Sequence, residues 1–167
     1  EEFNVLFKKN YKKKNIKYFR IPENSHEITF KKKQIIFGKA IKVSNGKDLT
    51  IVVTGTQLKN AIEAKNILFK RGYSLEILYY HTIRPFDYLK LRASIKKTRR
   101  LLTVEELSAH GGLYDQCIKS IVDIDGIKTK QLAIFDFIRG YGSYENLCSR
   151  AGLNTSNIII KALKLIK

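Results

Sequence analysis

The chain has 167 residues, 44% of them hydrophobic, and its formal net charge at pH 7 is +17. This length and apolar content predict one domain with a substantial core and room for a small appendage. No apolar run approaches the roughly 20 residues of a membrane-spanning helix, and no signal peptide is recognisable. We therefore expect a cytoplasmic protein without membrane contacts.

The positive charge raises the hypothesis of nucleic-acid binding, because lysine and arginine contacts to phosphate dominate such interfaces. Most of the 32 basic residues are lysines, however, and they are spread along the whole chain together with many Ile, Asn, Tyr and Phe residues. Short lysine runs occur only at 8–9, 12–14 and 31–33, and no DNA- or RNA-binding motif surrounds them. Compositional bias is therefore favoured, and we expect no nucleic-acid partner.

The cysteines and histidines do not predict a metal site. Cys117 and Cys148 lack the spacing of metal ligands and are typical of buried thiols, and the three histidines do not form a zinc set in the sequence. The chain contains no methionine and begins Glu1-Glu2. From this start we expect a piece of a longer protein.

The pattern changes along the chain. Residues 1–34 are rich in lysine and contain one short strand candidate, IKYFRIP (16–22), which its final proline ends. Between 35 and 140, strand and helix patterns alternate. The predicted strands are 35–43, 49–55, 75–83, 101–105 and 131–135, and the predicted helices are 57–70, 87–97 and 113–122. Two further helices are expected near 144–148 and from about 156 to the end.

Turn-forming residues at the ends of the predicted strands and helices support these boundaries. A turn at Asn45-Gly46 follows the first strand region, Gly72 ends the first helix, and Pro85 breaks the third strand before Asp87, which is a helix-cap candidate. The continuous apolar run at 49–55 is typical of a strand covered on both faces. Repeated strand–helix units predict an α/β fold with a mostly parallel sheet between two helix layers.

The stretch LLTVEELSAHGGLYD (101–115) contains the obvious catalytic candidates, Glu105, Glu106 and His110, at the carboxyl end of a strand, where open α/β sheets place ligands. The free amides of the helix that begins after Gly111-Gly112 offer a second interpretation, anion binding. The third is structural, with a glutamate capping the same amides. No nucleophile signature and no glycine-rich nucleotide motif adjoins the stretch. The spacing therefore favours structure over catalysis.

Four motifs recur in one order along residues 35–167: a G-K-A strand (38–40), an apolar strand ending Thr-Gly (54–55), an R-P-F-D turn (84–87) and the V-E-E…G-G stretch (104–112). This order resembles the C-terminal domain of the transketolase family of thiamine-diphosphate enzymes. The group also includes deoxyxylulose-phosphate synthases and 2-oxo-acid dehydrogenase beta subunits. The resemblance implies a three-layer α/β/α sandwich with a five-stranded mixed sheet and one antiparallel edge strand.

The resemblance also implies two domains, because residues 1–34 look like the tail of a pyrimidine-binding domain that precedes the C-terminal domain at 35–167. Within that tail Arg20 matches an arginine that contacts the substrate phosphate in sugar-phosphate members, a role that suits a guanidinium fork. The alternative is that Arg20 pairs with a surface carboxylate. In the family the cofactor lies between two other domains, and the C-terminal domain supports the dimer.

The family's G-D-G motif for metal and diphosphate and its activating glutamate have no counterpart here. We therefore expect no catalytic residue in this segment and no cofactor bound by it alone, with thiamine diphosphate and Mg²⁺ held elsewhere in the parent enzyme. The parent is expected to be a homodimer that transfers a two-carbon ketol unit between sugar phosphates, and this segment to work with its other domains or a companion subunit. The alternatives are a 2-oxo-acid dehydrogenase beta subunit and a non-catalytic anion-binding module that uses the Gly111-Gly112 turn.

Overall fold

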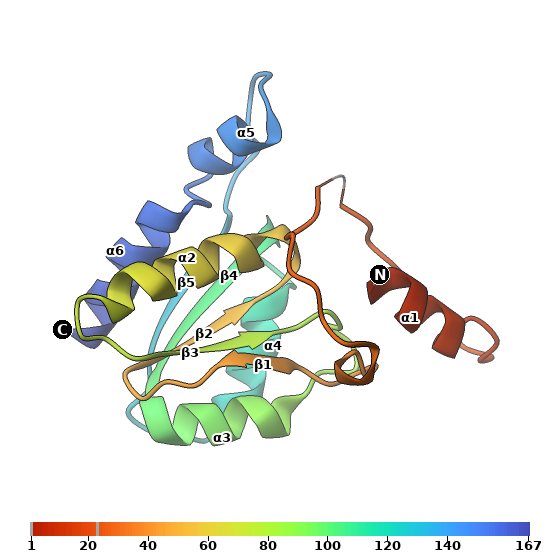
Figure 1. Ribbon diagram of the computed structural model, residues 1–167, viewed down its shortest axis with the longest axis horizontal. Helices are drawn as coiled ribbons and strands as arrows, with labels where there is room; N and C mark the ends of the chain where they lie inside the picture. Colours follow the sequence, from red (N-terminus) through yellow and green to blue (C-terminus); the bar gives the residue numbers. More distant parts are fainter. Residues whose placement is uncertain (1, 23) are drawn as a thin grey trace.

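A five-stranded sheet forms the centre of the computed structural model, which describes residues 2–22 and 24–167 (Figure 1). Its strands lie in the order β1-β3-β2-β4-β5. The edge strand β1 is antiparallel to β3, and all the other pairs are parallel. The strands are β1 (Ile41–Ser44), β2 (Leu49–Val53), β3 (Leu75–Tyr79), β4 (Arg100–Ser108) and β5 (Lys128–Ile134). The predicted mixed sheet with one antiparallel edge is confirmed.

Helices cover both faces of the sheet (Figure 1). On one face lie α2 (Leu58–Phe69) and α6 (Thr155–Ile166), and on the other lie α3 (Tyr88–Thr98) and α4 (Leu113–Ile121). A short helix, α5 (Tyr144–Arg150), and two 3-10 turns, η1 (Lys32–Gln34) and η2 (Gly55–Gln57), complete this part of the chain. No helix in the described part of the chain is both long enough and apolar enough to cross a membrane.

Strand alternation divides the core into two layers. Ile51 and Val53 of β2 pack in the cluster under α2 and α6, whereas Val52 between them packs under α3 and α4. Successive side chains of a strand point to opposite faces, and every residue of β2 is buried, as the continuous apolar run predicts for a covered strand. This central strand and its neighbours hold the loops at their carboxyl ends on a rigid base.

The N-terminal region departs from the prediction. The strand predicted at 16–22 is wrong, because that segment pairs with no other strand in the described structure, and residues before it form an unpredicted helix, α1 (Glu2–Asn10). A strand exists only through a neighbouring edge, so strand propensity alone does not form one. Ile16 and Tyr18 are almost fully exposed. Glu2 attaches α1 to the domain, since its carboxylate accepts a hydrogen bond of 2.8 Å from the Tyr79 hydroxyl.

The first strand region is also shorter than predicted, because only the end of 35–43 joins the sheet as β1. Gly38 lies ahead of it with φ at +75°, and a Cβ at this position would approach Pro85 Cγ to 2.7 Å. The backbone amide of Ala40 donates to Asp87 Oδ2 over 3.1 Å. The G-K-A segment is therefore bound to the R-P-F-D turn.

Asp87 joins these two segments and also caps α3, as the sequence predicts. Its other oxygen, Oδ1, accepts the Lys90 amide at 3.4 Å, and the residue is buried. Replacing Asp87 by alanine leaves the Ala40 and Lys90 amides without acceptors and is expected to lower the free energy of unfolding by about 2 kcal/mol. Urea denaturation measures this loss. Asp87→Asn keeps one carbonyl acceptor and should lower the free energy of unfolding by less than Asp87→Ala. Equal losses of stability in the two variants would contradict the capping role.

Candidate functional site

Two adjacent carboxylates of β4, Glu105 and Glu106, lie near the carboxyl end of the sheet, and both are buried. Since they are neighbours on a strand, their side chains point to opposite faces. Glu105 faces α4, and Glu106 faces η2 and α5. The two glutamates of this one motif therefore contact different parts of the structure.

Glu105 caps α4. Its Oε2 accepts the Leu113 amide at 2.7 Å, and its Oε1 accepts the Tyr114 amide at 3.1 Å. A Cβ on Gly112 would lie 2.2 Å from Oε2, so the glycine makes room for the carboxylate. Burial raises the pKa of Glu105, and the two amide bonds oppose that rise. The amides that an external anion would need are therefore already occupied.

Glu106 joins three segments on the other face. Its Oε1 accepts the Thr56 amide at 3.3 Å, its Oε2 accepts the Thr56 hydroxyl at 2.5 Å, and the Tyr144 hydroxyl donates to the same Oε2. Gly55, with φ at +63°, again makes room, because a Cβ there would lie 2.5 Å from Oε1. The Thr-Gly motif after β2 and the second glutamate of the V-E-E motif are thus parts of one contact.

Three turn contacts therefore connect the four sequence motifs: Gly38 and Ala40 with Pro85 and Asp87, Gly55 and Thr56 with Glu106, and Gly112 and Leu113 with Glu105. In each, a carboxylate accepts at least one backbone amide that lies within two residues of a glycine. Both carboxylates of β4 accept hydrogen bonds from donors of the fold itself.

Arg20 reaches this edge from the N-terminal region. Its Nη1 lies 3.6 Å from Glu106 Oε1, and its Nη2 donates to the Glu106 carbonyl over 3.4 Å. The Arg20 side chain is 42% exposed, whereas that of Glu106 is 4% exposed. The partner is thus a buried carboxylate rather than the surface carboxylate considered from the sequence. The guanidinium remains accessible, and its phosphate-binding role stays a prediction.

The remaining candidates do not join this group. His110 is exposed, and its amide donates to the Ser108 hydroxyl, while the Gly111 amide donates to Asp115. The sequence interpretation did not identify Thr56 and Tyr144, which the structure brings to Glu106. No local signal marks Tyr144, because it lies 38 residues further along the chain and only the fold brings it to β4.

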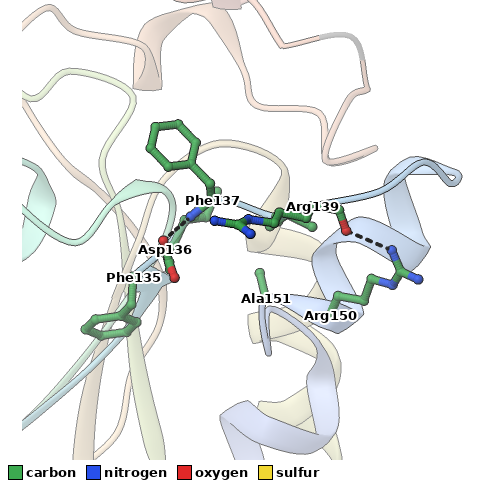
Figure 2. A pocket seen from close by; sticks show the side chains of 8 residues that line it. Phe135, Asp136, Phe137, Arg139, Arg150 and Ala151 are labelled. Atoms are coloured by element: carbon green, nitrogen blue, oxygen red, sulfur yellow. Dashed lines mark hydrogen bonds between the residues drawn. The ribbon is translucent and has the colours of Figure 1, made fainter.

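A hollow lies beside the carboxyl end of β5, with a volume of about 370 Å³ (Figure 2). Phe135, Phe137 and Arg139 line it from the loop, and Arg150 lines it from α5. Arg150 donates to the Arg139 carbonyl over 3.5 Å and so joins α5 to the loop. Across residues 2–22 and 24–167, no three His, Cys, Asp or Glu side chains are grouped so that they could hold a metal ion.

Comparisons with known proteins agree with the motif order. A sequence profile described as "Transketolase, C-terminal domain" matches residues 38–158. A solved structure titled "Split gene transketolase, inactive beta4 tetramer" superposes with a TM-score of 0.72 at 26% identity, covering 88% of this chain and 48% of that one. The fold is therefore that of this neighbour.

Two curated relatives differ in their named activities. One of them, from Phocaeicola vulgatus, is named as a subunit of an apulose-4-phosphate transketolase and is 28% identical over 134 residues, which are 80% of this chain and 43% of the relative. The other is the mitochondrial beta-2 subunit of the pyruvate dehydrogenase E1 component of Oryza sativa subsp. japonica. It is 37% identical over 86 residues, 52% of this chain and 23% of the relative. The chain thus spans less than half of the length of each.

Proposed function

Since the chain belongs to the transketolase C-terminal domain family, we propose that it is part of a thiamine-diphosphate enzyme that transfers a two-carbon ketol unit between sugar phosphates. The observation that carries the choice of substrate is Arg20, a half-exposed guanidinium at the carboxyl edge of the sheet. A guanidinium binds phosphate through parallel charge-assisted hydrogen bonds. The named activity of the Phocaeicola relative, an apulose-4-phosphate transketolase, supports the same substrate class.

In this proposal residues 1–34 are the end of a pyrimidine-binding domain and residues 35–167 are the C-terminal domain. The match to the family profile begins at residue 38, which supports a boundary nearby. The aromatic side chains of the first region support it too, because Phe3 and Phe7 of α1 and Tyr11 just after it have neighbouring rings and are 39–51% exposed. Exposed aromatic rows of this kind mark contact surfaces, here one toward the rest of the pyrimidine-binding domain.

The segment itself contributes structure and substrate binding rather than a catalytic group. The residues described here do not fit a metal–diphosphate site, since they include neither a group of metal ligands nor a G-D-G motif. In this proposal the other domains or a companion subunit hold thiamine diphosphate and Mg²⁺. When bound there, the cofactor supplies the carbanion that carries the two-carbon unit. A homodimer is part of the proposal, and the cytoplasmic location stays a prediction.

Reconstitution tests the proposal. The chain joined to its pyrophosphate- and pyrimidine-binding regions, with thiamine diphosphate and Mg²⁺, should transfer a ketol unit from xylulose 5-phosphate to ribose 5-phosphate. Arg20→Ala is expected to raise the KM for the phosphorylated donor roughly a hundredfold, because it removes a charge-assisted contact of about 3 kcal/mol. Arg20→Lys keeps the positive charge and should raise this KM by a smaller factor. An enzyme without ketol transfer would contradict the proposal.

The rice relative supports a second candidate, a 2-oxo-acid dehydrogenase beta subunit. Incubating the same reconstituted enzyme with pyruvate distinguishes the two. Decarboxylation of pyruvate, with no dependence on Arg20 and no ketol transfer, would replace the proposed function by this alternative. The third interpretation, an anion-binding module at Gly111-Gly112, is disfavoured because Glu105 already accepts the helix amides.

A further inference from the structure

We propose that Glu106 is a positioning residue that fixes the Arg20 guanidinium for the phosphate of the substrate; this inference rests on the proposed function. Glu106 meets Arg20 twice, through its carboxylate at 3.6 Å and its main-chain carbonyl at 3.4 Å. Two contacts to different guanidinium nitrogens define both the position and the plane of the group. A single contact would leave the plane free to rotate.

The contacts leave part of the guanidinium available. Arginine carries five N–H donors, and Arg20 uses Nη1 and Nη2 toward Glu106, so within the described part of the chain Nε–H and the other N–H bonds remain for a ligand. The Arg20 side chain is 42% exposed, so part of it is accessible to solvent. This arrangement suits a bound phosphate on one side of the guanidinium and the protein on the other.

Glu106 is itself held by several hydrogen bonds and by burial, as a positioning residue must be. Thr56 holds its carboxylate through the main-chain amide and the hydroxyl, and Tyr144 donates a further hydrogen bond. A side chain at Gly55 would collide with it, so the position next to the turn is kept open for the carboxylate. Burial of the side chain, 4% exposed, fixes its rotamer by packing.

Two effects of the Glu106 charge on phosphate binding oppose each other. The charge repels a phosphate, and it also holds an otherwise flexible arginine in the orientation that phosphate needs. Donors from Thr56 and Tyr144 offset part of the negative charge, and the carboxylate is buried whereas the guanidinium is partly exposed. Arginine loses much side-chain freedom when it binds, so the ordering effect is expected to exceed the repulsion.

The test compares Glu106→Gln with a matched neighbour, Glu105→Gln, in the reconstituted enzyme. Both changes remove one buried charge from β4, but only Glu106 contacts Arg20. Glu106→Gln should raise the KM for xylulose 5-phosphate about tenfold and leave both kcat and the KM for unphosphorylated xylulose unchanged. Glu105→Gln should lower the unfolding midpoint but keep the ratio of the two KM values. An unchanged or lower KM for the phosphorylated donor in Glu106→Gln, or equal effects of the two variants, would overturn the inference.

A second measurement separates this inference from the proposed function, because it needs no activity. In the 167-residue chain, the NMR signal of the Arg20 Nε–H group reports side-chain order, and inorganic phosphate is the probe. The wild type and Glu105→Gln should show an ordered Arg20 signal that phosphate shifts, and Glu106→Gln should show an averaged signal with about a tenfold weaker phosphate affinity. An Arg20 signal and phosphate affinity that Glu106→Gln leaves unchanged would overturn the positioning role even if ketol transfer is found. If ketol transfer is absent while these shifts occur, only the proposed function fails.

Discussion

Replacing Gly46 by alanine is expected to lower the free energy of unfolding by about 3 kcal/mol or more. The turn containing Gly46 lies against the start of β3, and an added Cβ would come within 2.1 Å of the Leu75 carbonyl carbon and 2.2 Å of the Glu76 nitrogen. These are main-chain atoms of a strand paired on both sides, so they cannot move aside without breaking the sheet. Urea or thermal denaturation measures the loss.

The matched control for this prediction is Gly126→Ala. Gly126 has φ at +70° and nothing within 4 Å of an added Cβ, so alanine there meets only left-handed backbone strain, about 1–2 kcal/mol. Gly46 has no positive φ, and its cost comes from close approach alone. If Gly46→Ala were as stable as the wild type, the turn would not pack against β3 as described.

Replacing Gly112 by alanine is expected to cost about 2–3 kcal/mol by expelling the Glu105 carboxylate from α4. The added Cβ would lie 2.2 Å from Glu105 Oε2, and the displaced carboxylate would leave the Leu113 and Tyr114 amides without their acceptor. A double-mutant cycle tests this mechanism. In a Glu105→Ala background, Gly112→Ala should cost less than about 0.5 kcal/mol, because nothing remains to be expelled.

The adjacent Gly111 supplies the control for this cycle. It has φ at +78° and open space around an added Cβ, so Gly111→Ala should cost about 1–2 kcal/mol in backbone strain. That loss should be the same whether residue 105 is glutamate or alanine. If the losses of unfolding free energy caused by Gly112→Ala and Glu105→Ala were additive, the lack of a side chain at Gly112 would not be needed to accommodate the Glu105 carboxylate.

The sequence was most informative where packing and local propensity agree. The helix predicted at 57–70 is α2, the strand predicted at 49–55 contains β2, and Asp87 caps α3 as expected. Buried strands with continuous apolar runs and helices with one apolar face are specified by short segments, so they can be identified without knowing their neighbours. The same reason explains the correct prediction of the layers.

The N-terminal region shows the opposite case. IKYFRIP has strand-forming residues, but it pairs with no strand in the described part of the chain, so the segment stays outside the sheet. The helix before it was not predicted, because its segment is rich in lysine and only Leu6 and Asn10 are buried, which leaves a weak apolar pattern. Long-range partners, rather than local preference, decide such segments.

At the candidate site, the sequence identified the chemical groups but not their partners. A structural cap was the favoured interpretation of the two glutamates, and Glu105 has that role. Strand alternation implies that Glu106 points to the face opposite Glu105, but its partners there, Thr56, Tyr144 and Arg20, could not be foreseen. These partners lie 50, 38 and 86 residues away in the chain.

The placement of the three turn contacts bears on how the gene can be divided. Every amide, glycine and carboxylate in them belongs to residues 38–114, so cutting the polypeptide ahead of Gly38 severs none of them. Arg20 and Glu106, by contrast, lie on opposite sides of such a cut. Two separately encoded pieces would therefore have to meet before Arg20 contacts Glu106, and under the proposed function assembly would then be a condition for binding the sugar phosphate.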